Sequence, residues 1–292
     1  MKPKRWLMAP FSWLYGTGVE LRKLLYKTRI IRQFHFEPFV ISVGNLAAGG
    51  TGKTPHIEWL VRLLQDEYKV AVLSRGYGRK TKGFRFVEIT STATEVGDEP
   101  LQIKRKFPDI PVVVGEKRAL AIPEIMAAFP ETEVILMDDA FQHLPVHRDL
   151  DILLTQYSNP YFEDALLPAG YLREAASGAA RADVVIFTKT PEKVSARDKR
   201  VMVEKLKLRP GQEVFFSGLE YGGLKPLSGE AVATDPSHFE EVLLLTGIAD
   251  NSQILQYLDN FALAVHPIHF RDHYLFRKED LEQVKKRFLQ LA

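Results

Sequence analysis

The strongest chemical signal in the chain is a glycine-rich turn that ends in Lys-Thr. A β-prone run over 39–43 leads into the turn, and apolar residues at helical spacing follow it from Lys53 onward. Glycines let backbone N–H groups face a phosphate, Lys53 can reach the outer phosphates, and the Thr54 hydroxyl can ligate magnesium. The spacing therefore predicts a nucleotide-binding phosphate loop, made of Gly49, Gly50, Thr51, Gly52, Lys53 and Thr54.

The loop departs from the full pattern in one place, because its first glycine is replaced by Ala47. The alternative interpretation is a glycine turn that only caps a structural helix. A strand before the turn and Lys-Thr at the expected position favour nucleotide binding over that alternative.

A pair of carboxylates, Asp138 and Asp139, follows the apolar run 134–137. In open α/β sheets ligands gather at the carboxyl ends of strands, so these acids should face the same crevice as the phosphate loop. A magnesium-binding acid of a phosphoryl-transfer enzyme belongs there. Gln142 and His143 follow closely in the sequence. An isolated Asp-Asp elsewhere would instead indicate a solvated turn.

Phosphoryl transfer to a hydroxyl also needs a proton acceptor and cations that spread the developing charge. Candidate acids are Asp98 and Glu99, although from the residues alone a turn before a helix is the better explanation of them. Candidate cations are Arg75, Arg118 and Arg173, each of which could instead be a surface ion-pair residue.

The elements that must position these residues alternate between apolar strands and segments of helical composition. Strands buried on both faces are typical of a parallel sheet covered by helices, so the pattern predicts a doubly wound α/β core. Residues 212–230 are rich in turn residues and predict a linker or small hairpin, and 278–291 predicts an amphipathic helix. The predicted strands cover 39–43, 70–73, 110–114, 134–137, 150–154, 184–187 and 242–245.

Composition excludes several classes of function. The 292 residues contain no cysteine, which rules out disulfides, thiolate metal sites and a cysteine nucleophile. The net charge of +2 is too small to indicate a nucleic-acid partner. The stretch 266–274 holds several histidines but matches no zinc spacing.

Positive charge is concentrated before the first strand, among aromatic and aliphatic residues at helical spacing. Such a segment is typical of a helix in a membrane interface, although a helix packed on the protein's own core is an equally good interpretation. We expect neither a signal peptide nor a spanning helix, because no long uninterrupted apolar run occurs. The basic residues are Lys2, Lys4, Arg5, Arg22, Lys23, Lys27, Arg29 and Arg32.

Taken in order, these motifs resemble the tetraacyldisaccharide 4'-kinase family, which phosphorylates the lipid A disaccharide 1-phosphate with ATP at the inner membrane of Gram-negative bacteria. The similarity spans nearly the whole chain and departs from the family pattern at Leu144, Ala175, Arg271 and Tyr274. The motifs occupy 43–45, 49–55, 73–78, 97–100, 138–143, 148–151, 167–174, 181–183, 246–249 and 272–273.

This resemblance implies a P-loop NTPase-like parallel sheet sandwiched by helices, a second, smaller α/β domain and an N-terminal amphipathic helix. The implied domains are a membrane-associating helix over 1–35, a kinase core over 36–211, a β linker over 212–230, and a small domain over 231–292 that closes over nucleotide. The implied location is the cytoplasmic face of the inner membrane, with peripheral or monotopic attachment. Expected partners are the lipid A disaccharide 1-phosphate and the membrane surface, without nucleic acid or an obligatory protein partner.

The resemblance also implies roles for individual residues, with ATP and Mg2+ as cofactors. Asp98 would accept the proton of the sugar hydroxyl, His273 would pair with Asp98, and Lys53 would take part in catalysis. The implied nucleotide contacts are Gly49, Gly50, Thr51, Gly52, Lys53, Thr54, Arg173 and Gln142. The implied magnesium ligands are Thr54, Asp138, Asp139 and Glu174, and the implied substrate contacts are Asn45, Arg75, Arg118 and His143.

Three other functions fit part of the sequence. A P-loop switch ATPase or GTPase is disfavoured, because its membrane-associated dimeric forms carry an extra lysine where this chain has Ala48. A membrane-binding module without enzymatic activity leaves Lys53 and Asp138 unexplained. A kinase for a soluble sugar or nucleoside differs only in its acceptor, and the segment before Gln33 would distinguish that function.

Overall fold

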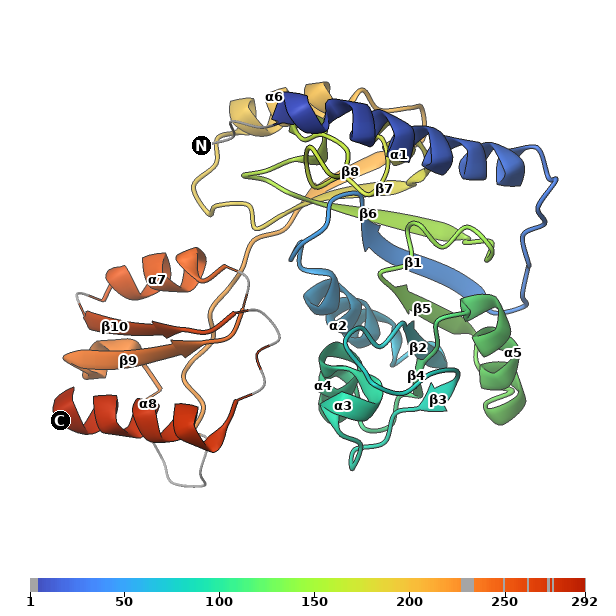
Figure 1. Ribbon diagram of the computed structural model, residues 1–292. Coiled ribbons are helices and arrows are strands. Elements are labelled where there is room, and N and C mark those ends of the chain that lie inside the picture. Colours follow the sequence, from blue (N-terminus) through green and yellow to red (C-terminus); the bar gives the residue numbers. More distant parts are fainter. Residues whose placement is uncertain are drawn as a thin grey trace. The chain divides into compact units, whose positions relative to one another are not determined.

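The computed structural model describes residues 5–226, 234–248, 250–261, 263–271, 274 and 276–291. The chain forms two compact units, Met1–Leu219 and Glu220–Ala292 (Figure 1). The predicted catalytic residue His273 lies outside the described residues, and so does Asp272 beside it.

The first unit is built on an eight-stranded sheet with the order β3-β4-β2-β5-β1-β6-β7-β8. Every neighbouring pair of strands is parallel except β3 and β4, which are antiparallel. The predicted parallel α/β sheet is therefore confirmed. The strands are β1 (Phe39–Asn45), β2 (Val70–Ser74), β3 (Arg85–Phe86), β4 (Val112–Val114), β5 (Val134–Asp138), β6 (Leu150–Gln156), β7 (Val184–Thr188) and β8 (Glu213–Phe216).

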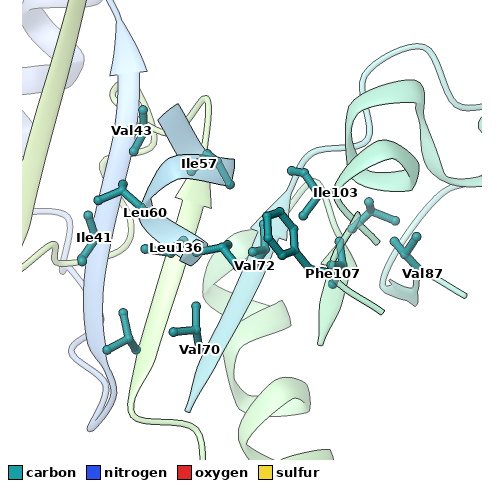
Figure 2. Packing of buried hydrophobic residues seen from close by; sticks show 14 of the residues in the cluster. Ile41, Val43, Ile57, Leu60, Val70, Val72, Val87, Ile103, Phe107 and Leu136 are labelled. Carbon is teal, nitrogen blue, oxygen red and sulfur yellow. The ribbon is translucent and has the colours of Figure 1, made fainter. Parts of the chain in front are cut away.

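Side chains that alternate along the central strands fill two cores, one on each face of the sheet. On β1, Ile41 and Val43 enter the core that lies under α2 (Lys53–Leu64) and α4 (Asp98–Lys106), whereas Val40 enters the opposite core. Figure 2 shows the first core, where Ile57 and Leu60 of α2 lie over the strands. Because both faces are buried, the central strands are mostly apolar, which is why their sequence signal is clear.

The opposite face is covered by α5 (Arg118–Ala128) and, further along the sheet, by η2 (Ala176–Arg181) and α6 (Ala196–Leu206). Two short helices complete the connections, α3 (Ala93–Val96) and η1 (Tyr161–Glu163). Helices thus sandwich the sheet, and the carboxyl ends of its parallel strands all open at one edge.

The predicted N-terminal helix is present as α1 (Arg5–Lys27). Its small and polar side chains contact the protein: the Ser12 hydroxyl donates to the Leu166 carbonyl at 3.0 Å, and the Tyr15 hydroxyl donates to the Arg173 carbonyl at 2.7 Å. Its large apolar side chains are exposed instead, namely Leu7, Met8, Phe11, Trp13, Leu14, Leu21 and Leu24. No described helix combines the length and apolar character needed to cross a bilayer.

The second unit pairs β9 (Glu241–Thr246) with β10 (Ala264–His269) in a parallel two-stranded sheet. The helices η3 (Pro236–His238), α7 (Ser252–Asp259) and α8 (Lys278–Leu291) accompany these strands. The predicted range 212–230 for the linker includes β8, which pairs with β7 and thus belongs to the main sheet. The boundary between the units follows Leu219.

Candidate active site

The candidate site lies at the carboxyl edge of the sheet, where neighbouring strands end in polar residues. Strand β1 ends at Asn45, β2 at Ser74 and β5 at Asp138, and the register aligns Val43 with Asp138. The loop after β1 is the predicted phosphate loop, and α2 begins at Lys53 as expected. The predicted strand, loop and helix around this motif are therefore confirmed.

The phosphate loop is held in shape by hydrogen bonds. Gly49 and Gly52 have positive φ angles of 123° and 83°, which only glycine adopts without strain. The Asn45 side-chain amide donates to the Thr51 hydroxyl at 2.8 Å, and Gln156 donates from β6 to the Gly50 carbonyl at 2.8 Å. These hydrogen bonds fix the conformation of the loop, whose backbone N–H groups can then bind an anion at the start of α2.

The substitution of glycine by Ala47 has a local explanation. Ala47 does not have a positive φ angle, and it forms an antiparallel β-bridge with Leu172. On either side of this bridge, the Ala48 N–H donates to the Tyr171 carbonyl at 2.8 Å, and the Arg173 N–H donates to the Leu46 carbonyl at 2.7 Å. A β-like pairing therefore supports the first half of the loop, and no glycine is required there.

Asp139 and Arg173 form a two-pronged ion pair beside the phosphate loop. Arg173 donates to the two Asp139 carboxylate oxygens at 2.8 and 3.1 Å, and Lys53 Nζ lies 3.9 Å from Asp139 Oδ1. Although burial acts in the opposite direction, these cations lower the pKa of Asp139, so it is ionised at neutral pH. Arg173 also donates to Asn45 Oδ1.

Asp138 is buried, with an exposed fraction of 5%. Ser74 donates to its Oδ2 at 3.2 Å, whereas its Oδ1 has no hydrogen-bond partner among the described residues. Burial first, and then the charge of Asp139, raises the pKa of Asp138 to about 6. An unsatisfied buried carboxylate oxygen next to a phosphate loop is suited to a hard cation.

These residues fit the predicted magnesium ion in part. Among the described residues no three His, Asp or Glu side chains converge on one point. Mg2+ in phosphoryl-transfer sites usually takes only one or two protein ligands and completes its octahedron with phosphate oxygens and water. Asp138 Oδ1 and the Thr54 hydroxyl are the groups of this chain that suit that arrangement.

Glu174 is also buried, but both of its oxygens are already in use. Arg181 donates to them at 2.8 and 2.9 Å, Gln142 donates to Oε1 at 3.0 Å, and Lys23 lies 3.6 Å away. Although burial opposes ionisation, the Arg181 contacts lower the pKa of Glu174. Gln142 also donates to the Asn45 carbonyl at 2.8 Å, so this cluster supports the start of the phosphate loop.

Asp98 is exposed in the first turn of α4. Gly97 before it has φ 94°, and a Cβ there would lie 3.0 Å from the Cα of Gly76. This close approach presses the turn that carries Asp98 against the loop that carries Arg75. The charge of Glu99 contributes to the raised pKa of Asp138. The start of α4 therefore lies near the carboxylate pair.

Arg118 lies beside the carboxylates, and His143 lies within the field of Arg118 and other arginines. Arg118 is buried and donates to the Asp138 carbonyl at 3.1 Å, and burial is the main cause that lowers its pKa to about 10. Burial and, next, the charges of Arg118 and Arg148 lower the pKa of His143 to about 3. His143 is therefore neutral at physiological pH.

The structure brings most of the predicted residues together in one connected group around the loop. Lys53, Asn45, Asp138, Asp139, Arg173, Gln142 and Glu174 belong to it. The sequence did not place Ser74, Arg181, Lys23 or Tyr15 in the site. Ser74 and Arg181 occur within the recognised motifs, whereas Lys23 and Tyr15 meet the site only through folding.

A parallel sheet with a phosphate loop after β1 and acidic residues at the end of β5 defines a P-loop nucleotide-binding enzyme. A sequence profile described as tetraacyldisaccharide-1-P 4'-kinase matches residues 4–291. The chain therefore belongs to the tetraacyldisaccharide-1-P 4'-kinase family and is a kinase.

Individual relatives agree with this assignment. The tetraacyldisaccharide 4'-kinase of Phocaeicola vulgatus is 45% identical over 296 residues, which cover 100% of this chain and 81% of the relative. That of Flavobacterium johnsoniae is 40% identical over 97% of this chain and 83% of the relative. A solved structure of LpxK from Aquifex aeolicus in complex with ATP is 33% identical, with a TM-score of 0.74 over 94% of this chain and 85% of that chain.

Proposed function

We propose that this protein transfers the γ-phosphoryl group of MgATP to the 4'-hydroxyl of a tetraacyldisaccharide 1-phosphate, a lipid A precursor. The observation that carries the proposal is the group formed by Lys53, Asp139, Arg173 and Asn45 at the phosphate loop, in a chain of this family. Cations held against a fixed anion and a loop of backbone N–H groups are what phosphoryl transfer requires.

In this mechanism the phosphate loop and Lys53 bind the outer phosphates. Asp139 and Asn45 hold the Arg173 guanidinium from two sides, so it is fixed beside the loop before nucleotide arrives. A preorganised cation of this kind stabilises charge that develops during transfer without a cost of reorganisation at that moment. Arg173 would thus act on the transferred group, and Asn45 would position both the loop and the arginine rather than contact the acceptor.

Magnesium would be held by the Thr54 hydroxyl and Asp138. When bound, the ion neutralises phosphate charge during transfer. The free Oδ1 of Asp138 supports this assignment. We assign Glu174 a positioning role, because Arg181 and Gln142 engage both of its oxygens and connect it to the start of the loop.

Asp98 is the proposed base that accepts the proton of the acceptor hydroxyl. Its place in the first turn of α4, close to the loop of Arg75, supports this role. His273, which lies outside the described residues, would orient Asp98 when the second unit, with the small domain over 231–292, closes over nucleotide. Arg118 would contribute positive charge near the acidic pair, and Arg75 and neutral His143 would contact the acceptor.

The acceptor would be reached at the cytoplasmic face of the inner membrane. Helix α1 supports this placement, because it exposes aromatic and aliphatic side chains beside basic residues. We expect Trp13→Ser with Leu14→Ser to reduce binding to lipid vesicles and transfer to micellar lipid. Both side chains are exposed, with exposed fractions of 72% and 67%. Unchanged vesicle binding would refute the role of this face.

The decisive assay follows labelled γ-phosphate from MgATP into tetraacyldisaccharide 1-phosphate in detergent micelles. Lys53→Ala should abolish transfer, and Asp98→Asn should abolish transfer while ATP binding persists, because it removes an interaction made chiefly in the transition state. Asp66→Asn, a change of an exposed aspartate at the surface, serves as the matched control for Asp98→Asn. Full transfer by Asp98→Asn would remove the base assignment. Lys53-dependent ATP hydrolysis without lipid product would instead favour a switch ATPase.

A further inference from the structure

His56 has no role in the proposed mechanism, although it contacts the phosphate loop. It lies in the first turn of α2, directly after the motif 49–55, and is half-buried. Its Nδ1 lies 2.7 Å from the Gly52 carbonyl oxygen, and its Nε2 lies 3.1 Å from the Ser217 hydroxyl. Because a carbonyl oxygen can only accept, Nδ1 carries a proton and donates it to Gly52. The imidazole thus joins the phosphate loop to the residue that follows β8.

Ser217 is firmly attached to the main sheet. Its N–H donates to the Phe187 carbonyl at 2.9 Å, and its carbonyl accepts from the Thr190 N–H at 2.9 Å. Both bonds join Ser217 to the end of β7 and the turn after it, so its backbone is held from two sides. The Ser217 hydroxyl can therefore fix the plane of the His56 ring from outside the phosphate loop.

The Gly52 carbonyl matters because of the peptide group to which it belongs. Gly52 has a φ of 83°, and a glycine changes its backbone angles at little cost. In a planar trans peptide the carbonyl and the following N–H point in opposite directions, so the bond from His56 directs the Lys53 N–H away from the imidazole. The first N–H groups of a helix point out of its N-terminus, where a phosphate binds. Rotation of this peptide would present a carbonyl oxygen to the phosphate instead.

The backbone alone holds this peptide weakly. The His56 N–H also donates to the Gly52 carbonyl, but at 3.3 Å, which is longer than the bond from the ring. Gln156 makes a comparable side-chain contact to the Gly50 carbonyl at 2.8 Å. We infer, resting on the proposed function, that His56 is a positioning residue that holds the Gly52–Lys53 peptide in the orientation that binds a phosphate of the nucleotide.

The inference is tested with two substitutions of His56 in the full-length chain. His56→Phe keeps a ring but loses both hydrogen bonds, whereas His56→Asn keeps a side-chain N–H near the position of Nδ1. His238→Phe is the matched control, because His238 is exposed and also contacts a backbone carbonyl, that of Asp235. The KM for ATP and kcat are measured at saturating lipid, and the Kd of ATP is measured by equilibrium binding without lipid.

We expect the KM and the Kd of His56→Phe for ATP to rise roughly tenfold, the loss that corresponds to one hydrogen bond at a binding site. Its kcat should change little, because the bond holds the phosphate equally before and during transfer. His56→Asn should recover most of the loss, since it can still donate to the Gly52 carbonyl. His238→Phe should behave as the unmodified protein does.

An unchanged KM and Kd in His56→Phe would overturn the inference. A fall in kcat at constant KM would overturn it too, because it would mean that the bond only stabilises the folded enzyme. The same holds if His56→Asn binds ATP as weakly as His56→Phe. An unmodified protein that binds ATP but does not phosphorylate the lipid would refute the proposed function, and the comparison of Kd values would still decide the role of His56.

Discussion

The buried carboxylate of Asp138 should make the site less stable than the rest of the sheet. Asp138 has an exposed fraction of 5%, and one of its oxygens has no hydrogen-bond partner among the described residues. A charge buried in this way is costly unless it is fully paired. We therefore expect Asp138→Asn to stabilise the nucleotide-free protein at neutral pH while it removes activity.

The magnitude follows from the pKa of Asp138, which is raised from 3.8 in the unfolded chain to about 6 in the fold. Each pKa unit corresponds to about 1.4 kcal/mol, so ionised Asp138 lowers the free energy of unfolding by roughly 3 kcal/mol. Because the folded pKa is the higher one, the contribution of Asp138 to stability is greatest below pH 4 and declines as pH rises through about 6. The asparagine variant lacks this decline.

Urea denaturation of both proteins in EDTA, between pH 3.5 and 8, measures the effect. The variant minus wild-type difference should change by roughly 3 kcal/mol across this range, in favour of the variant at high pH. An unpaired amide in the variant removes about 1–3 kcal/mol at every pH, so the change with pH is the diagnostic quantity. Asp66→Asn, at an exposed position, should give a difference near zero throughout.

A stability difference that stays constant from pH 3.5 to 8 would refute the reasoning, because it would mean that Asp138 is not strained by ionisation. A variant that loses stability as pH rises would also contradict it. Phosphoryl transfer by the same variant tests the other half of the prediction. Activity close to wild type would remove Asp138 from the magnesium site.

Three further changes test the surrounding groups. Arg173→Lys loses the two-pronged pair with Asp139. This variant should lower kcat/KM for ATP, measured at saturating lipid, by about 10-fold or more. Arg181→Ala leaves Glu174 buried with Lys23 as a more distant cation and Gln142 as a hydrogen-bond donor, and it should cost about 3 kcal/mol in urea denaturation, of which Glu174→Gln recovers most. His143 should stay neutral in NMR titrations down to pH 4, since its pKa lies at about 3; titration near pH 6 would contradict this.

The central strands were predictable from the sequence because burial on both faces makes them mostly apolar. Edge strands lack that signal. In β8 the side chains alternate between exposed and half-buried, and Gln212 and Glu213 disguise its start, so 212–230 was interpreted as a linker or hairpin. Strand β3 is exposed and two residues long, pairs with β4 at the edge of the sheet, and has no periodicity to detect.

The phosphate loop and the acidic pair were predictable for the same reason, because each follows an apolar strand directly. The partners that tune the acidic residues were not. Lys23, which is far away in the sequence, lies 3.6 Å from Glu174, and Asn45 is fully buried between Thr51 and Arg173. Such contacts are created by tertiary packing and leave no local pattern.

These contacts also decide how the role of α1 can be tested. Deletion of the residues before Gln33 would remove the exposed apolar face, but it would also remove the Tyr15 bond to the Arg173 carbonyl and the Lys23 charge beside Glu174. Arg173 and Glu174 together hold the phosphate loop through Asn45 and Gln142. A truncated protein that fails on lipid would therefore not distinguish lost membrane contact from a disturbed nucleotide site. The exposed-face substitutions at Trp13 and Leu14 make that distinction, because they leave both contacts in place.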